Sequence, residues 1–184
     1  MNYFTVLLIS ALLFAPHTAS AHPETGLLPD AIAETEYKIV LEINPRDIPT
    51  RTKLGMVLYR KNKLREAEQQ ITEVLKSAPK DFDAHDVMGL IRLKEKKPAE
   101  AIAWFQKAIA LKSEDTMVHH SLGLALEQSG RYQEAEASYR RGLEVNDRLL
   151  RKGANREKEK ERRNTLLSAL QGVEPRLKTS RGGI

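Results

Sequence analysis

The chain has 184 residues, of which 30% are charged and 5% are aromatic, and it contains no cysteine. The lack of cysteine excludes disulfides, thiolate metal sites and cysteine nucleophiles. The net charge of +5 is unevenly placed, because residues 148–184 hold 11 basic and 4 acidic side chains. Few aromatic and many charged residues favour an extended helical array over a globule with one thick core.

The N-terminal segment 1–21 carries no Lys, Arg, Asp or Glu, and the run from Tyr3 to Ala15 is almost wholly apolar. The run leads into Ala19-Ser20-Ala21, a small-x-small pattern suited to signal peptidase. It is shorter than the roughly 20 residues of a membrane-spanning helix. We therefore expect an export signal over residues 1–21 that is cleaved near Ala21, and a periplasmic or secreted mature protein. An uncleaved anchor is the alternative, because the usual basic start is missing.

The next segment, residues 22–29, is expected to be extended, and the repeat register then begins with half a unit over residues 30–47. Within it, Ala33, Tyr37 and Val40 lie one full repeat period before Ala67, Ile71 and Val74 of the first full unit. We expect a helix over residues 30–43, capped by Asp30, that covers the first helix of that unit. The helix that would complete this half-unit falls inside the export signal.

Three full units of equal length follow, over residues 48–81, 82–115 and 116–149. Each unit repeats a pair that ends in glycine, then an alanine, then a bulky residue. The pairs are Leu54-Gly55, Met88-Gly89 and Leu122-Gly123, the alanines are Ala67, Ala101 and Ala135, and the bulky residues are Ile71, Phe105 and Tyr139. A fixed period of this length indicates stacked helix-turn-helix units. The small residues should let the two helices of a unit approach closely, and the bulky ones should fill the gap toward the next unit.

The register is lost after residue 149. Residues 150–174 combine leucines with a run of alternating charge, which is typical of a polar helix that shields the last apolar face of an array. We expect a charged capping region over these residues, broken by Gly153 into two short helices, and a disordered tail over residues 175–184.

This pattern resembles the tetratricopeptide repeat family over residues 48–149. The resemblance implies an all-α, right-handed solenoid of antiparallel helix pairs, with three full repeats, an N-terminal half-repeat and a C-terminal capping helix. It also implies a concave groove, lined by the first helices of successive units, that binds a peptide or helix of another protein. The groove residues implied are Thr52, Met56, Tyr59, Arg60, Asp86, Leu90, Leu93, Lys94, His120, Leu124, Glu127 and Gln128.

One use of the family is not expected here. Chaperone co-factors of the family clamp the terminal carboxylates of a peptide with Lys, Arg and Asn at set positions of the groove. The corresponding positions hold Thr52, Met56, Val87, Met117 and Ser121. None of these side chains carries a positive charge, so recognition of a carboxylate tail is not predicted.

The sequence shows no catalytic constellation, so we expect no enzymatic activity, no cofactor and no metal site. His85 and His119 occupy matching places of successive units and are interpreted as packing residues. His22 would become the first residue after cleavage at Ala21, and its amine and imidazole would suit copper. Whether His22 binds copper stays open at this stage.

The sequence thus predicts a non-catalytic adaptor that binds a protein or peptide partner and supports assembly of a cell-envelope complex. A scaffold that self-associates through the ends of the solenoid, as a homo-oligomer, is the alternative. Binding of nucleic acid is not expected, because the basic C-terminal region is mixed in sign and lacks interleaved aromatic residues. That region would make at most peripheral contact with an anionic membrane.

Overall fold

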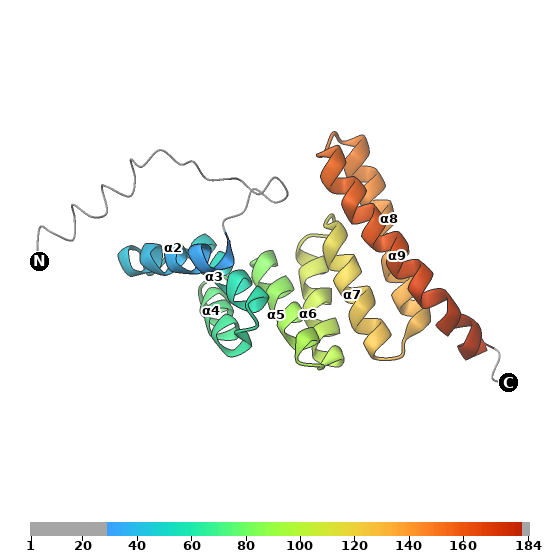
Figure 1. The fold of residues 1–184 in the computed structure, drawn as a ribbon, viewed down its shortest axis with the longest axis horizontal. Coiled ribbons are helices and arrows are strands. Elements are labelled where there is room, and N and C mark those ends of the chain that lie inside the picture. The colour runs from blue at the N-terminus through green and yellow to red at the C-terminus, as the bar shows by residue number, and fades with distance from the viewer. Residues whose placement is uncertain (1–28, 182–184) are drawn as a thin grey trace, which may run out of the picture.

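The computed structural model describes residues 29–181, so the predicted export signal, His22 and all but the last residue of segment 22–29 lie outside the described residues. The described part folds into eight α-helices, with no strand among them. They are α2 (Asp30–Ile43), α3 (Ile48–Arg60), α4 (Leu64–Ser77), α5 (Phe82–Lys94), α6 (Pro98–Leu111), α7 (Thr116–Gln128), α8 (Tyr132–Arg151) and α9 (Arg156–Arg181). Each helix packs against the next along the chain, and the array is elongated (Figure 1). The predicted all-α solenoid is confirmed.

The first helix of each full unit begins and ends in the same way. Asp47, Asp81 and Asp115 are the N-cap residues of α3, α5 and α7, and each side chain accepts a backbone N–H of the first turn. At the other end the turn needs a residue with positive φ, which is Asn62, Lys96 or Gly130. Glycine takes this conformation freely and asparagine is tolerated, but a lysine is strained there.

Each glycine of the repeated pairs lies beneath the bulky residue of its own unit. A Cβ added to Gly55 would stand 2.5 Å from Ile71, and one added to Gly89 would stand 2.5 Å from the ring of Phe105. Gly123 is covered in the same way by Tyr139. The bulky residues therefore cover the glycine of their own unit, and they also belong to core clusters with residues of the next unit, as Ile71 does with Val87 and Ile91.

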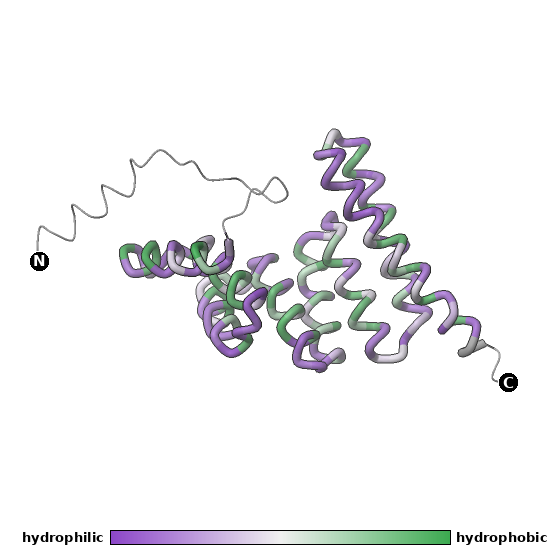
Figure 2. Tube along the Cα trace, in the orientation of Figure 1, coloured by the Kyte–Doolittle hydropathy of each residue, from purple (hydrophilic) through white to green (hydrophobic). Residues whose placement is uncertain are grey.

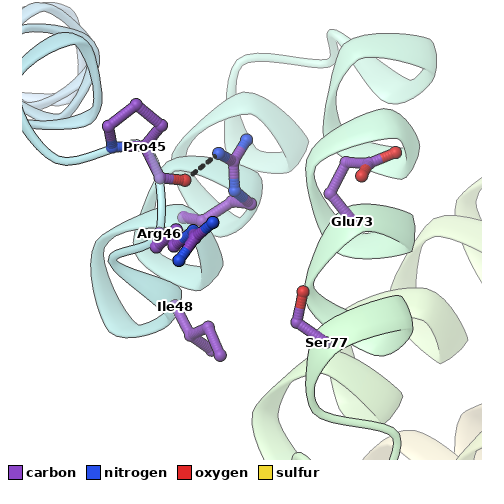
Figure 3. A pocket seen from close by; sticks show the side chains of 6 residues that line it. Pro45, Arg46, Ile48, Glu73 and Ser77 are labelled. Atoms are coloured by element: carbon purple, nitrogen blue, oxygen red, sulfur yellow. Dashed lines mark hydrogen bonds between the residues drawn. The ribbon is translucent and has the colours of Figure 1, made fainter.

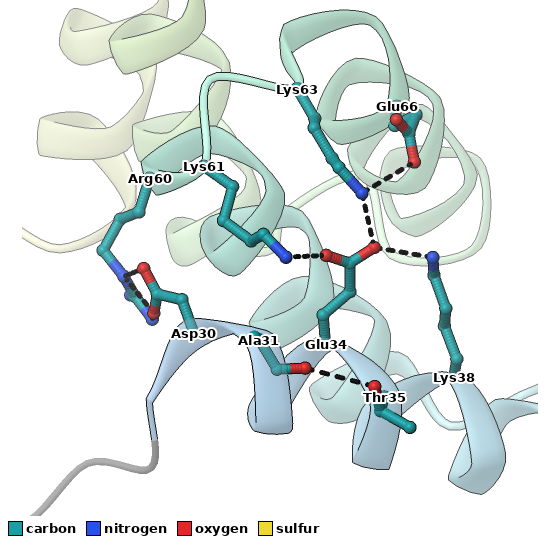
Figure 4. A network of polar contacts seen from close by, with 9 residues as sticks. All are labelled: Asp30, Ala31, Glu34, Thr35, Lys38, Arg60, Lys61, Lys63 and Glu66. Atoms are coloured by element: carbon teal, nitrogen blue, oxygen red, sulfur yellow. Dashed lines mark hydrogen bonds and ion pairs between the residues drawn. The ribbon is translucent and has the colours of Figure 1, made fainter.

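Helix α2 covers α3, as expected for a half-unit, through apolar contacts of Ala33, Tyr37 and Leu41 and through a set of ion pairs. The carboxylate of Glu34 is buried and lies 2.6–2.8 Å from the ammonium groups of Lys38, Lys61 and Lys63 (Figure 4). Hydrogen bonds from these lysines hold the pKa of Glu34 well below its usual range. Asp30 does not cap the helix as predicted. The N-cap residue is Pro29, and the Asp30 carboxylate instead accepts hydrogen bonds from Arg60.

The C-terminal region differs from the prediction. Gly153, with a φ of 84°, lies in the turn between α8 and α9, but the region holds two long helices of 20 and 26 residues instead of two short ones. Helix α9 continues through Pro175 to Arg181, so the predicted disorder from residue 175 is wrong up to that point. Val173 and Leu177, on either side of the proline, are buried in the core cluster, and this packing outweighs the helix-breaking tendency of proline.

A buried polar cluster attaches α9 to the rest of the solenoid. Glu159 on α9 is almost fully buried, and its carboxylate accepts a hydrogen bond of 2.6 Å from the side-chain amide of Asn146 on α8. The same amide donates to the backbone carbonyl of Glu159 at 2.8 Å. Arg162 neutralises the carboxylate from one turn further along, at 2.8 Å. The cap is thus fixed by specific hydrogen bonds as well as by its apolar face.

Candidate partner-binding face

Helices α3, α5 and α7 lie side by side, because α3 contacts α5 and α5 contacts α7 (Figure 1). All twelve residues of the predicted groove belong to these three helices, four to each. We call this set the first-helix face. Its side chains differ widely in exposure, and that exposure decides which of them can meet a partner.

The apolar stripe of the face is narrower than the sequence suggested. Leu93 is buried in the core, with 9% of its surface exposed. Met56, Tyr59 and Leu90 are half-buried and pack against the two core clusters. Leu124, with 36% of its surface exposed, is the most accessible large apolar residue of the face. The apolar contact offered to a partner therefore centres on Leu124, with the edges of the half-buried residues beside it.

Two residues predicted for the first unit are engaged within the chain. Thr52 is buried, and its hydroxyl donates a hydrogen bond to the backbone carbonyl of Ile48 at 3.1 Å. The guanidinium of Arg60 is paired with Asp30 of α2 at 2.5 Å. Both side chains thus serve the fold, and neither is free for a partner.

Tyr59 on α3 interacts with two charged residues of α5, Lys94 and Asp86. The Lys94 ammonium lies 4.7 Å above the ring of Tyr59 and donates to the Tyr59 carbonyl at 3.2 Å. Burial raises the pKa of Asp86 to about 7, and the carboxylates of Asp115 and Asp83 add to the shift. The Oδ1 atom of Asp86 is buried and has no hydrogen-bond partner among the described residues.

A buried carboxylate oxygen without a donor is costly, so the Oδ1 atom of the half-buried Asp86 favours either a proton or a cationic group supplied by a ligand. Burial also raises the pKa of Tyr59, and the charge of Asp86 contributes to that shift. The two side chains are therefore close enough to influence each other.

A second polar group lies where α7 meets α8. The hydroxyl of Tyr139 donates a hydrogen bond to Glu127, and the ring of His120 lies 5.8 Å from the ring of Tyr139. Burial lowers the pKa of His120. Burial raises the pKa of Tyr139 strongly, and the hydrogen bond to Glu127 adds to the shift. At neutral pH His120 is thus uncharged and Tyr139 keeps its proton; because Tyr139 is fully buried, only the half-buried His120 and Glu127 of this group are accessible at the surface.

A network that the sequence did not reveal joins the first two units. The Arg92 guanidinium on α5 is largely buried and pairs with Glu68 on α4, with Glu95 at 2.9 Å and with Glu100 at 3.0 Å. These hydrogen bonds raise the pKa of Arg92 further above its usual value. The partners lie up to 24 residues apart in sequence. In the sequence, only the alternation of acidic and basic residues around the turn after α5 could have indicated this network.

The chain matches two family models of the tetratricopeptide repeat, one over residues 52–116 and the other over residues 117–149. Together they cover more than half of the chain. The chain belongs to the tetratricopeptide repeat family. Repeats of this family are generally non-enzymatic modules that bind other proteins. A comparison with curated proteins finds no match.

Several solved structures resemble this tetratricopeptide solenoid. The crystal structure of MamA has a TM-score of 0.58 at 19% identity, covering 83% of this chain and 91% of that chain. A structure of MamA AMB-1 has a TM-score of 0.51 at 23% identity, covering 61% and 66%. The first TPR domain of the human RPAP3 protein, solved by NMR, has a TM-score of 0.62 at 18% identity, covering 77% and 100%. At these identities the likeness shows the fold alone.

Two histidines of this tetratricopeptide array, His85 and His119, act as packing residues. His85 and His119 are buried at equivalent places, with a ring nitrogen 2.8 Å from the Asp81 carbonyl and 3.2 Å from the Ser113 carbonyl, respectively. Within residues 29–181 no group of three or more acidic or histidine side chains could hold a metal ion. No helix in that part of the chain is long and apolar enough to cross a membrane.

A pocket of about 290 Å³ lies away from the first-helix face, between the turn before α3 and the end of α4 (Figure 3). The Arg51 guanidinium donates to the Pro45 carbonyl at 2.6 Å and to Gln70 at 2.8 Å. Glu73 and Ser77 line the opposite wall. The Arg51 guanidinium is thus already hydrogen-bonded within the chain, whereas Arg46 also lines the pocket.

Proposed function

We propose that this protein is a non-catalytic adaptor that binds a peptide or helix of a partner protein across the first-helix face. Membership of the tetratricopeptide repeat family supports the general role. The observation that carries the specific assignment is the presence, on one face of the solenoid, of the exposed Leu124 and of the half-buried Asp86, whose buried Oδ1 atom has no hydrogen-bond partner among the described residues. Leu124 offers an apolar contact to a partner, and the carboxylate of Asp86 would be stabilised by a positive charge of the partner.

The chemistry of the face indicates the kind of segment that it would take. Met56, Tyr59 and Leu90 supply half-buried apolar surface beside Leu124. A Lys or Arg of the partner near Asp86 would form a charge-assisted hydrogen bond with its carboxylate, which is stronger than a neutral one. We therefore infer a partner segment with apolar anchors and a basic residue. The face lacks the cations that would recognise a terminal carboxylate.

The site of action is inferred from the sequence of the N-terminal segment 1–21. The apolar run and the small-x-small pattern support export and cleavage near Ala21, and so a role in assembling a cell-envelope complex. The mixed charge of α9 argues against binding of nucleic acid. It is compatible with at most a peripheral contact with an anionic membrane.

The test uses two leucines of similar exposure on different surfaces. Leu124 lies on the first-helix face and Leu111 lies at the end of α6, outside it, with 36% and 39% of their surfaces exposed. The wild-type protein captures its partner from the native envelope, and the captured protein is then used in titration calorimetry. We expect Leu124→Glu to abolish binding and Leu111→Glu to preserve it. Equal binding by the two variants would contradict the assignment of the face.

A scaffold that stacks head to tail through its two ends is the second candidate. The exposed isoleucines of α2 favour self-association, because they leave this end of the described residues apolar. The outer surface of α9 is mainly charged, which does not match that end.

A further inference from the structure

Helix α2 carries a strip of exposed isoleucines. Ile32, Ile39 and Ile43 have 50%, 48% and 80% of their surfaces exposed, although the terminal helices of a solenoid normally present a polar outer face. Residues spaced by 7 and 4 positions lie on one side of a helix. The three side chains, which we call the isoleucine strip, thus lie along one side of α2, a helix whose trace includes strongly hydrophobic residues (Figure 2).

A first helix that completed the half-unit would not cover the strip. In the repeat register, the strip aligns with Glu66, Glu73 and Ser77 of the first unit, all of which are exposed to solvent. A first helix would instead cover the positions that align with Ile71 and Val74, which are Tyr37 and Val40. The isoleucines therefore occupy outward positions where the next unit is polar. Their exposure is a property of the sequence at this end of the array.

The exposed surface of α9, at the C-terminal side of the described helices, is polar where that of α2 is apolar. The exposed side of α9 presents Lys160, Asn164, Gln171 and Lys178, and Leu167, at 39%, is the large apolar residue exposed on this helix. A head-to-tail contact would thus place the isoleucine strip against charged and amide groups, which lose hydration without gaining partners. The strip matches a second strip better than it matches α9.

We propose that two copies of this chain associate through α2, in antiparallel orientation about a two-fold axis. This register places Ile32 against Ile43 of the partner copy, with Ile39 of each copy near the axis. An isologous contact of this kind is closed, because each copy uses the same surface and none remains for a third. The polar α9 then forms both outer ends of the dimer.

The antiparallel register has an electrostatic consequence. Glu36 lies one turn after Ile32, at the edge of the strip, and is exposed. The two-fold axis brings the Glu36 carboxylates of the two copies to the same edge of the contact. Like charges at short range oppose association, and salt screens them. The dimer should therefore tighten as ionic strength rises, opposite to the behaviour of a contact between acidic and basic surfaces.

Sedimentation equilibrium of the full chain over a concentration series tests the proposal. We expect a monomer–dimer equilibrium that strengthens with salt and never exceeds the dimer mass. Ile39→Glu should weaken dimerisation at least tenfold, Leu167→Glu on α9 should leave it unchanged, and Glu36→Gln should strengthen it. Circular dichroism should show equal helicity in all variants, since the substituted side chains are exposed.

Each contrary outcome overturns a stated part of the inference. A wild-type chain that stays monomeric at all concentrations would show that the strip binds something else, such as residues 1–28 or another protein. A mass that grows beyond the dimer would show an open stack. A dimer that survives Ile39→Glu, or that is indifferent to Glu36→Gln, would refute the antiparallel contact. None of these results depends on whether a partner binds the first-helix face.

Discussion

Gly89 and Phe105 should be energetically coupled, because the ring of Phe105 lies on the glycine. A Cβ at position 89 would stand 2.5 Å from a ring that is fully buried and cannot retreat. Overpacking a core costs about 1–3 kcal/mol. Alanine is favoured over glycine within a helix by about 1 kcal/mol. The difference predicts that Gly89→Ala destabilises the wild-type chain by up to about 2 kcal/mol.

The same substitution should stabilise a chain that lacks the ring. Phe105→Ala alone should cost about 3–5 kcal/mol, through lost burial and the cavity that remains. In that background the added methyl group at position 89 has room, so only the gain in helix propensity of about 1 kcal/mol is left. The double variant should therefore be more stable than Phe105→Ala by about that amount, and the effect of Gly89→Ala changes sign between the two backgrounds.

Urea denaturation followed by far-ultraviolet circular dichroism measures the four free energies of unfolding. Gly172→Ala is the matched control, because Gly172 lies within α9 and a Cβ added there would have nothing within 4 Å. It should stabilise the chain by up to about 1 kcal/mol. If Gly89→Ala has the same sign with and without the Phe105 ring, the steric explanation of the repeated glycine is wrong.

Three further predictions concern polar groups. Falling pH should release α2 first, because the pKa of Glu34 is lowered in the folded chain. Its contribution to folding stability is therefore present above the unfolded pKa and lost as acid protonates the carboxylate. Amide exchange in α2 should report this pH dependence, and Glu34→Gln should remove it. The pKa of Asp86 is instead raised to about 7, so the folded state should lose stability as pH rises toward 7, and Asp86→Asn should flatten that slope in urea titrations. Asn146→Ala should destabilise the chain by about 1–3 kcal/mol, because the buried Glu159 loses the amide donor of Asn146 and keeps only its other donors, and amide exchange should accelerate in α9 more than in α5.

The fixed repeat period was enough to place the helices of the solenoid. Units that repeat Gly55, Gly89 and Gly123 at a fixed interval can form only a few stacked arrangements, so the register alone indicated α2 through α8. The end of α9 could not be derived in this way. A proline predicts the end of a helix from local sterics, whereas Val173 and Leu177 continue the helix through contacts with residues far away in the sequence.

The candidate site was predictable as a set of helices and less so as a set of exposed side chains. Position in the repeat placed Leu93 and Arg60 on the same face as Leu124. Packing between units then buries Leu93, and α2 takes Arg60 into an ion pair with Asp30. Both effects depend on the neighbouring unit, which the pattern of a single helix does not contain. The twelve groove residues stay a prediction, now weighted toward Leu124 and Asp86.

Helix α2 should respond to protein concentration more than any other helix of the described part. Its buried apolar contribution is Ala33, and the rest of its attachment rests on ion pairs and half-buried residues, so its local opening free energy is expected to be low. Association through the isoleucine strip adds stability by mass action, about 2.7 kcal/mol at one hundred times the dissociation constant. That corresponds to roughly 100-fold slower amide exchange.

The effect should be confined to α2 and its neighbour α3, because the helices of a solenoid contact only nearby helices. Amide exchange measured by mass spectrometry at low and high protein concentration would detect it, with α6 as the internal reference. In the Ile39→Glu variant, amide exchange in α2 should not depend on protein concentration. Its rate should equal that of the wild-type chain at low concentration. Exchange in α2 that stays constant across the wild-type series, while sedimentation shows a dimer, would place the contact on another surface.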